Sequence, residues 1–534
     1  MTAPLPFQTP HDVRQALLAR AEIALLDVRE EDPFAQAHPL FAANFPAGRL
    51  ELEAWSRIPR RDTPIVVYDN GEGLAEPAAR TLQQLGYTRV ALLQGGLQGW
   101  KDAGGEIFID VNVPSKAFGE LVESVRHTPS LPAEAVQALL DSQADVVVLD
   151  ARRFDEYQTM SIPTGISVPG AELVLRARAL APDPATRIIV NCAGRTRSII
   201  GTQSLVNAGL PNPVSALRNG TIGWTLAGQT LDHGADRRFG DVDPAQQAEA
   251  AQSARAVADR AGVRRAQSAD LERFAAESAR TTYAFDVRTP EEFTAGHLPG
   301  FRSAPGGQLV QETDHSAPVR GARIVLADTD GVRANMSASW LAQMGWEAWV
   351  LDGVPATAFS ERGAPPQDYP EPAHESPWAW VEPAELAQWL QDTPPGHTAI
   401  LDTTTSANYT LRHLPGAWFV LRSELAQAVA RIPKAQRYVL TCGSSLLARY
   451  AAADLARLTG AEVHVLRGGT LAWIQAGLPL EHGASHLASP RTDRYRRPYE
   501  GTDNAREAMQ GYLDWEFGLV EQLGRDGTHG FQVI

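Results

Sequence analysis

The sequence predicts an α/β protein built from four copies of one domain, and three landmarks with matched spacing support this prediction. The first landmark is the aspartate that ends an apolar run: Asp27, Asp150, Asp286 and Asp402. The second is the residue after the next apolar run, 42, 42, 42 and 40 residues later: Asp69, Cys192, Asp328 and Cys442. The third is a glycine 67 to 70 residues after the first landmark: Gly96, Gly220, Gly353 and Gly469.

Each copy alternates strand-like and helix-like segments in the order strand, helix, strand, helix, strand. The strand-like runs are short, apolar and rich in β-branched residues, which is typical of parallel strands buried on both faces. Residues 132–142 and 197–209 have the pattern of helices beside such runs. This alternation predicts right-handed βαβ units and therefore a layered α/β domain with a parallel sheet.

The landmarks divide the chain of 534 residues into domains at 1–112, 113–240, 263–372 and 373–483. The Ala- and Gln-rich stretch 241–262 is expected to be a helical or flexible linker, and 369–378 has the prolines and charges of a second linker. The tail 484–534 starts basic and aromatic and continues as an amphipathic helix. Docking of this tail on the domains is the favoured interpretation, and a homodimer contact is the alternative.

Composition narrows the classes of partner and compartment. The chain has 48 Lys+Arg and 63 Asp+Glu, so its formal net charge of −15 argues against nucleic acid or an anionic membrane as the main partner. Residues 1–20 have no signal-peptide core and no long apolar run occurs, which favours a cytoplasmic protein. Two cysteines without a C-x-x-C motif indicate free thiols, and no metal or organic cofactor is expected.

The third copy contains FDVRTPEEFTAGHLPG at 285–300, which resembles the signature of the rhodanese family. The second copy has a blurred form of this string after Asp150, and the fourth keeps HLPG within 412–418. A closing Gly-Gly-x-x-x-Trp motif ends at Trp100 and Trp473. The chain is thus similar to multi-domain rhodanese-related sulfurtransferases. This resemblance implies five-stranded parallel sheets with helices on both faces and a reactive cysteine after the fourth strand.

Most of the repeated residues are interpreted as structural. The Asp-x-Arg motifs are expected to form ion pairs at strand ends: Asp27 with Arg29, Asp150 with Arg152, and Asp286 with Arg288. The three tryptophans are expected to be buried anchors: Trp100, Trp224 and Trp473. His297 and His413 are expected to cap turns at least as readily as to catalyse.

Chemistry is expected at the second landmark, where the carboxyl edge of a parallel sheet places ligands. Cys192 is followed by a tight loop that feeds a helix, so backbone N–H groups should converge on its sulfur. The predicted substrate-binding residues are those of the loop: Ala193, Gly194, Arg195, Thr196 and Arg197. We expect the amides and both arginines to lower the thiol pKa from about 8.5.

The two arginines suggest an anionic donor such as thiosulfate, whose sulfur Cys192 would accept as a persulfide and pass to a thiol or cyanide. A Cys-dependent phosphatase is an alternative, but its loops place an arginine six positions after the cysteine, where this chain has Ser198. A sulfur-carrier or sensory scaffold, whose degenerate domains bind partners, is another alternative.

The other copies differ at the same position. Asp69 and Asp328 cannot carry a persulfide, so the first and third copies are predicted to be catalytically silent. The loop Cys442, Gly443, Ser444 and Ser445 resembles the uncharged loop of mercaptopyruvate sulfurtransferases and contains no arginine. Cys442 is therefore a second candidate site, with a weak site, a persulfide relay and an inert residue as open interpretations, the last of which is preferred.

Overall fold

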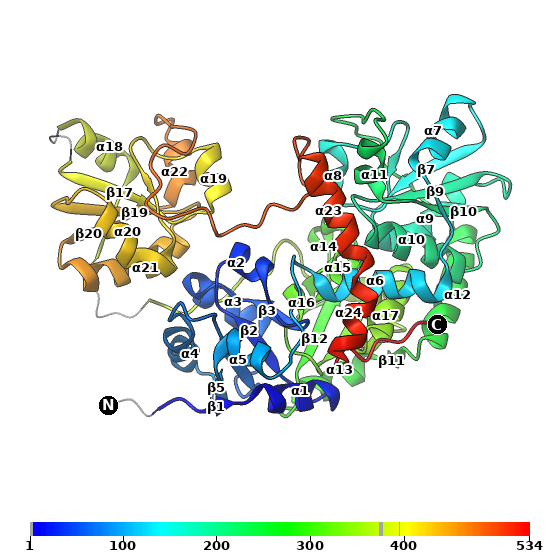
Figure 1. The fold of residues 1–534 in the computed structure, drawn as a ribbon, viewed down its shortest axis with the longest axis horizontal. Coiled ribbons are helices and arrows are strands. Elements are labelled where there is room, and N and C mark those ends of the chain that lie inside the picture. The colour runs from blue at the N-terminus through cyan, green and yellow to red at the C-terminus, as the bar shows by residue number, and fades with distance from the viewer. Residues whose placement is uncertain (1–3, 373–377, 393, 395) are drawn as a thin grey trace.

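The computed structural model describes residues 4–372, 378–392, 394 and 396–534, and these residues form four five-stranded sheets (Figure 1). All strand pairs within the sheets are parallel, and each sheet has the order first, fifth, fourth, second, third. Parallel neighbours need crossover connections, which place helices on both faces of the sheet. The predicted fold of four such domains with a C-terminal helical segment is confirmed. Residues 373–377 of the expected second linker lie outside the described residues.

The first domain is built around strands of which β2 and β4 are buried along their whole length, as the apolar runs predict. Its strands are β1 (Phe7–Gln8), β2 (Ala24–Asp27), β3 (Ala42–Asn44), β4 (Ile65–Tyr68) and β5 (Val90–Leu93). Its helices are α1 (Pro10–Leu18), α2 (Glu31–Gln36), η1 (Ala47–Arg49), α3 (Leu50–Arg57), α4 (Ala75–Gln84) and α5 (Gly96–Asp102).

The second domain repeats this arrangement. Its strands are β6 (Ser130–Leu131), β7 (Val146–Asp150), β8 (Ile166–Ser167), β9 (Arg187–Asn191) and β10 (Val214–Leu217). Its helices are α7 (Ala133–Asp141), α8 (Phe154–Thr159), η2 (Gly170–Glu172), α9 (Leu173–Leu180), α10 (Thr196–Asn207) and α11 (Gly220–Leu226). Because β9 lies between β10 and β7 at the centre of the sheet, the residue after it is placed at the middle of the carboxyl edge.

The third and fourth domains have the same topology. The strands of the third are β11 (Arg264–Ala266), β12 (Thr282–Asp286), β13 (Arg302–Ser303), β14 (Arg323–Ala327) and β15 (Glu347–Leu351). Its helices are α13 (Ser268–Ala276), α14 (Pro290–Ala295), α15 (Gly306–Gln311), α16 (Thr313–Ser316), α17 (Arg333–Gln343) and η3 (Ala356–Ala358). The strands of the fourth are β16 (Ala379–Val381), β17 (Thr398–Asp402), β18 (Trp418–Phe419), β19 (Arg437–Thr441) and β20 (Glu462–Leu466). Its helices are α18 (Pro383–Asp392), α19 (Ser406–Leu411), η4 (Arg422–Glu424), α20 (Leu425–Arg431), α21 (Leu446–Thr459) and α22 (Gly469–Gln475).

Four further helices join the domains. Helix α6 (Val113–Arg126) leads into the second domain, and α12 (Pro244–Arg260) packs against α9 and α17. The expected linker 241–262 is thus largely a helix, which begins after Asp243 because that side chain accepts hydrogen bonds from two N–H groups of the first turn. The tail helices α23 (Arg506–Phe517) and α24 (Leu519–Asp526) pack along α6, as the red ribbon in Figure 1 shows. The predicted docking of the tail is confirmed, whereas a homodimer contact stays a prediction.

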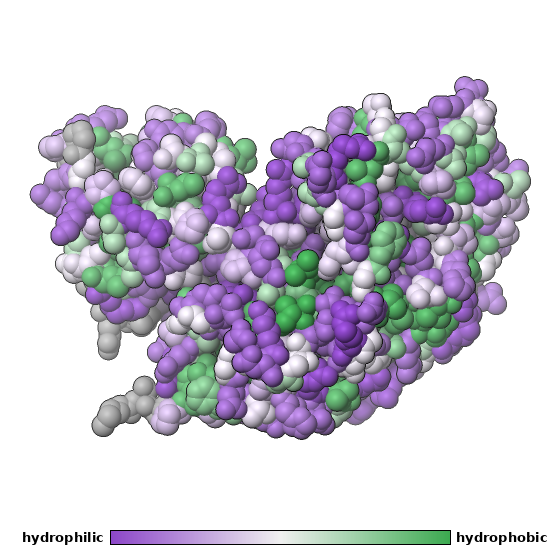
Figure 2. Space-filling model, viewed as in Figure 1, coloured by the Kyte–Doolittle hydropathy of each residue, from purple (hydrophilic) through white to green (hydrophobic). Residues whose placement is uncertain are grey.

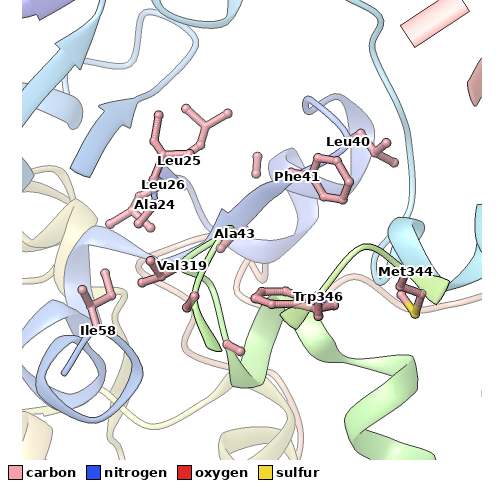
Figure 3. Packing of buried hydrophobic residues seen from close by; sticks show 14 of the residues in the cluster. Ala24, Leu25, Leu26, Leu40, Phe41, Ala43, Ile58, Val319, Met344 and Trp346 are labelled. Carbon is pink, nitrogen blue, oxygen red and sulfur yellow. The ribbon is translucent and has the colours of Figure 1, made fainter. Parts of the chain in front are cut away.

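The apolar core is shared by the first and third domains but not by the fourth. One cluster joins side chains of both domains with α6 and the end of the chain, and Figure 3 shows Ile58 and Phe41 near Val319 and Trp346. The fourth domain has two clusters of its own and meets the first domain through polar contacts, including the Arg422–Glu51 ion pair. The face of the molecule shown in Figure 2 is mostly hydrophilic, with a group of hydrophobic residues, in green, near its centre.

The residues interpreted as structural have the expected roles. Arg29, Arg152 and Arg288 each bond the aspartate two positions earlier, with Nη2–Oδ2 distances of 2.5, 2.6 and 2.6 Å. The predicted tryptophan anchors are buried, and each indole N–H donates to the carbonyl oxygen six residues later. The Nδ1 atoms of His297 and His413 lie 3.0 and 2.8 Å from a carbonyl oxygen one helical turn earlier.

Candidate active site

The loop that follows Cys192 lies between β9 and α10, and backbone N–H groups at the start of α11 bond its carbonyl oxygens. The N–H of Thr221 donates to the carbonyl oxygen of Cys192 at 2.9 Å, and that of Ile222 donates to Ala193 at 3.0 Å. Gly220 has φ +55°, and a Cβ there would come within 2.3 Å of the Cys192 oxygen. The repeated closing glycine therefore permits a close approach that any side chain would prevent.

The four second-landmark residues occupy a common cradle of backbone N–H groups. Asp69 accepts hydrogen bonds from the N–H groups of Gly71, Leu74 and Ala75 at 2.6–3.0 Å. Asp328 accepts from the third and sixth residues after it, at 2.9 and 2.7 Å. In the other two domains the N–H six residues after the cysteine bonds the sulfur and partly opposes the rise in thiol pKa that burial causes. The cradle thus favours negative charge, which a fixed carboxylate supplies in two domains and a thiolate can supply in the others.

The thiol of Cys192 is 2% exposed, and this burial raises its pKa above the ordinary value. The charge of Arg197 and hydrogen bonds from Ser198 act in the opposite direction. The expected lowering of the thiol pKa is therefore not found, because the sequence pattern shows the amides and arginines but not the covering of the loop. The resting cysteine holds its proton more firmly than a free thiol.

Arg195 is directed toward α6 and also donates through Nη1 to Asn219, at the start of α11, at 3.1 Å. Its Nε and Nη2 atoms donate to the two oxygens of Glu120 at 2.7 and 2.8 Å, and Nη2 also contacts Glu123. The guanidinium lies 4.2 Å from the ring centre of Phe517 and is buried. Its role in binding a donor, which the sequence suggested, has no support in this geometry, since its donors are already used.

Arg197 is the loop arginine that borders a cavity. It donates through Nη1 and Nη2 to Glu156 at 2.7 and 2.8 Å. Burial opposes ionisation of Glu156, but the charge and hydrogen bonds of Arg197 dominate and hold the pKa of that carboxyl at about 2. Arg197 lines a polar cavity of about 260 Å³, whereas Ala193, Gly194, Arg195 and Thr196 do not line it. The structure thus brings one of the five predicted binding residues to this cavity.

Helix α23 of the tail lies on the loop after Cys192, a contact that the sequence did not reveal. A Cβ on Gly194 would lie 3.1 Å from Tyr512 Cε1 and 3.3 Å from Glu516 Oε2, so α23 rests on this peptide. The ammonium group of Lys116 on α6 pairs with Asp110 at 2.7 Å. The rings of three tail residues surround this ammonium group at 5.2–5.6 Å: Tyr499, Tyr512 and Trp515. The basic and aromatic start of the tail was the only signal of this contact in the sequence.

The Cys442 loop has the same support but a different environment. The N–H of Thr470 donates to the Cys442 carbonyl oxygen at 2.8 Å, and Ser445 adopts φ +68° at the start of α21. The thiol is 4% exposed, and burial raises its pKa. Gly443 and Ser444, by contrast, are exposed, and no helix of the described tail lies on them.

Comparison with known proteins shows the class of the chain. The model of the rhodanese-like domain matches residues 9–103, 132–227, 270–353 and 382–476, and the chain belongs to this family. The solved structure of a thiosulfate sulfurtransferase from Pseudomonas aeruginosa is 70% identical, with a TM-score of 0.97, over 99% of this chain and 100% of that one.

Two curated proteins share single domains with the chain. An HTH-type transcriptional regulator of Mycobacterium tuberculosis is 32% identical over 99 residues, and the uncharacterized protein YqhL of Bacillus subtilis is 36% identical over 83 residues. These alignments span 18% and 16% of this chain, and 44% and 62% of the relatives. Among the described residues, none of the helices is both long and apolar enough to cross a bilayer.

Proposed function

We propose that the protein is a thiosulfate sulfurtransferase in which Cys192 carries the transferred sulfur as a persulfide. The observation that carries this proposal is the shared cradle: the N–H six residues on, which bonds a carboxylate in the first and third domains, bonds a sulfur in the second. Such donors stabilise the anionic sulfur that both halves of the reaction require. The similarity to the thiosulfate sulfurtransferase of Pseudomonas aeruginosa supports the same substrate class.

The reaction proceeds by double displacement. The thiolate of Cys192, formed when the thiol releases its proton to solvent, attacks the outer sulfur of thiosulfate, and the sulfur–sulfur bond of the donor breaks. Sulfite leaves with the electron pair of that bond, and Cys192 becomes an anionic persulfide. Cyanide or a thiolate then attacks the outer sulfur of the persulfide, which releases thiocyanate or a new persulfide and restores the Cys192 thiolate.

Arg197 and the cradle have distinct roles in this proposal. The cradle holds the negative charge on sulfur, while Arg197 supplies positive charge beside it. Because Arg197 is held by Glu156, it acts at a fixed position. We also propose a cytoplasmic location, because two unpaired cysteines and a thiolate-dependent reaction fit a reducing compartment.

The persulfide is the direct test of this function. Incubation of the pure protein with thiosulfate is expected to raise its intact mass by one sulfur atom, and peptide mapping should place that atom on Cys192. Addition of cyanide should remove it. If the mass is unchanged in the presence of excess thiosulfate, or the sulfur maps elsewhere, the assignment is wrong. Hydrolysis of an aryl phosphate that depends on Cys192 would instead support a phosphatase.

A further inference from the structure

The cavity beside Arg197 is closed by parts of the chain outside the second domain. It has a volume of about 260 Å³, and its walls come from Asn112, the second domain, the third domain and the tail. The tail contributes a short segment that starts at Arg497 and ends at Gly501, and the third domain contributes Gln308, Gln311 and Glu312. Arg197 is the residue of the Cys192 loop that reaches this cavity, and the cavity is bounded in part by residues on which the rhodanese signature gives no information.

Four arginines line this chamber, and three of them donate short hydrogen bonds to a carboxylate. Arg152 bonds Asp150, Arg153 bonds Asp155 and Arg197 bonds Glu156, with shortest nitrogen–oxygen distances of 2.6–2.8 Å. Part of each guanidinium is thus already directed at a protein acceptor. A ligand that enters the chamber gains little from a guanidinium whose hydrogen bonds are already made.

Arg497 differs from these three. Its guanidinium approaches Glu31 and Glu500 only to 3.6 Å, and it makes no hydrogen bond to any described residue. The side chain is 22% exposed and also lines a neighbouring cavity of about 290 Å³. It therefore presents unused N–H donors in a fork that matches the oxygens of a sulfonate or sulfate group.

We propose that the C-terminal segment completes the donor site, and that Arg497 holds the anionic end of the sulfur donor in this chamber. The proposal rests on the proposed function, and it assigns Arg497 as a specificity-determining residue. The chamber also contains acidic groups such as Glu312, which repel a dianion, so binding of a dianion needs a cationic group such as Arg497.

The test compares arginine variants in steady-state kinetics with thiosulfate and cyanide. Arg497→Met is expected to raise the KM for thiosulfate about tenfold or more, which is the effect of one lost charge-assisted hydrogen bond, with kcat and the KM for cyanide close to wild type. Arg497→Lys keeps the charge without the fork and should fall in between. Arg496→Met is the matched control, because Arg496 is exposed, bonds Asp503 and does not line the chamber.

Each other outcome counts against the proposal. If Arg497→Met and Arg496→Met have the same KM for thiosulfate, Arg497 does not bind the donor. If Arg497→Met lowers kcat and the melting temperature without a separate effect on this KM, its role is structural. If wild type and the control form no persulfide, the proposed function fails and this inference falls with it, which distinguishes the two cases.

Discussion

The loops of Cys192 and Cys442 share a cradle but differ in everything that surrounds it. The first is covered by α23, borders a chamber and is flanked by two paired arginines, whereas the second contains no arginine and has exposed peptides at Gly443 and Ser444. The backbone therefore determines where a sulfur sits, and the side chains and the cover determine what can reach it. The proposed anionic donor would meet the charge of Arg197 in the first environment, whereas the described loop after Cys442 offers it no arginine.

The largest expected effect comes from substitution of each of the two cysteines by serine. Cys192→Ser should abolish transfer from thiosulfate to cyanide, because the cradle then holds no group that can form a persulfide. Cys442→Ser should leave most of the activity, since its loop offers no charge to the donor. Thiocyanate formation measures both, and circular dichroism checks the fold. The reverse pattern would move the active site to the fourth domain.

The covering of the Cys192 loop by α23 can be tested by the rate at which a bulky thiol reagent labels each cysteine. In wild type we expect slower labelling of Cys192 than of Cys442, because α23 lies only on the former. Leu513→Ala removes a buried side chain that packs with Ile222, at a cost of about 2–5 kcal/mol to the docked helix. Labelling of Cys192 should then accelerate by about tenfold or more, as opening becomes easier.

The control for this test is Leu458→Ala, at an exposed position in the fourth domain. It should change the labelling of neither cysteine. Equal labelling of the two cysteines in wild type, or no effect of Leu513→Ala, would show that α23 does not protect Cys192 in solution.

The first and third domains, which are predicted to be silent, should give a smaller effect, on stability and not on activity. Asp69→Ala removes the acceptor of three N–H groups, so we expect a loss of about 1–3 kcal/mol in the free energy of unfolding of its domain. Denaturant unfolding measures this loss. Asp102→Ala, at an exposed position of the same domain, is the control. Loss of sulfur transfer in a folded Asp69→Ala protein would contradict a purely structural role for the first domain.

The smallest expected effect is a pH dependence of the folding stability that arises from Glu516 on α23. Burial raises the pKa of Glu516 from 4.5 to about 8, and Glu120 acts in the same direction. Between these values the unfolded chain releases a proton that the folded chain keeps, so stability falls as the pH rises from about 4.5 to about 8. Glu516→Gln should remove this slope.

Melting temperatures measured across this pH range test the expectation. The Glu516→Gln variant should exceed wild type by a margin that grows toward pH 8. Glu521→Gln is the control, because its carboxyl is 84% exposed. A margin that stays constant with pH would show that Glu516 is ionised in the folded protein.

Local spacing made the fold and the structural residues predictable. The ion pair of Asp150 and Arg152 joins residues two apart, and Trp224 bonds a carbonyl six residues on, so both contacts are properties of one short segment. The position of Cys192 follows from the same logic, because a residue after a central parallel strand must lie at the carboxyl edge. The role expected for Arg195 lacked such a basis, since a loop sequence does not show which acceptor its side chain meets.

The order of residues was enough to predict four domains, their parallel sheets and the two positions where a cysteine follows a central strand. That Arg195 is bound by Glu120, 75 residues away, and that α23 lies on Gly194 became visible in the folded chain alone. Repeats and strand patterns arise from contacts within short stretches and so can be seen in the order of residues. The residues of α6 and the tail that contact the Cys192 loop are distant from it in the sequence and reach it through the packing of the domains. Their amphipathic patterns indicate that one face of each helix is buried, but they do not indicate which residues cover that face.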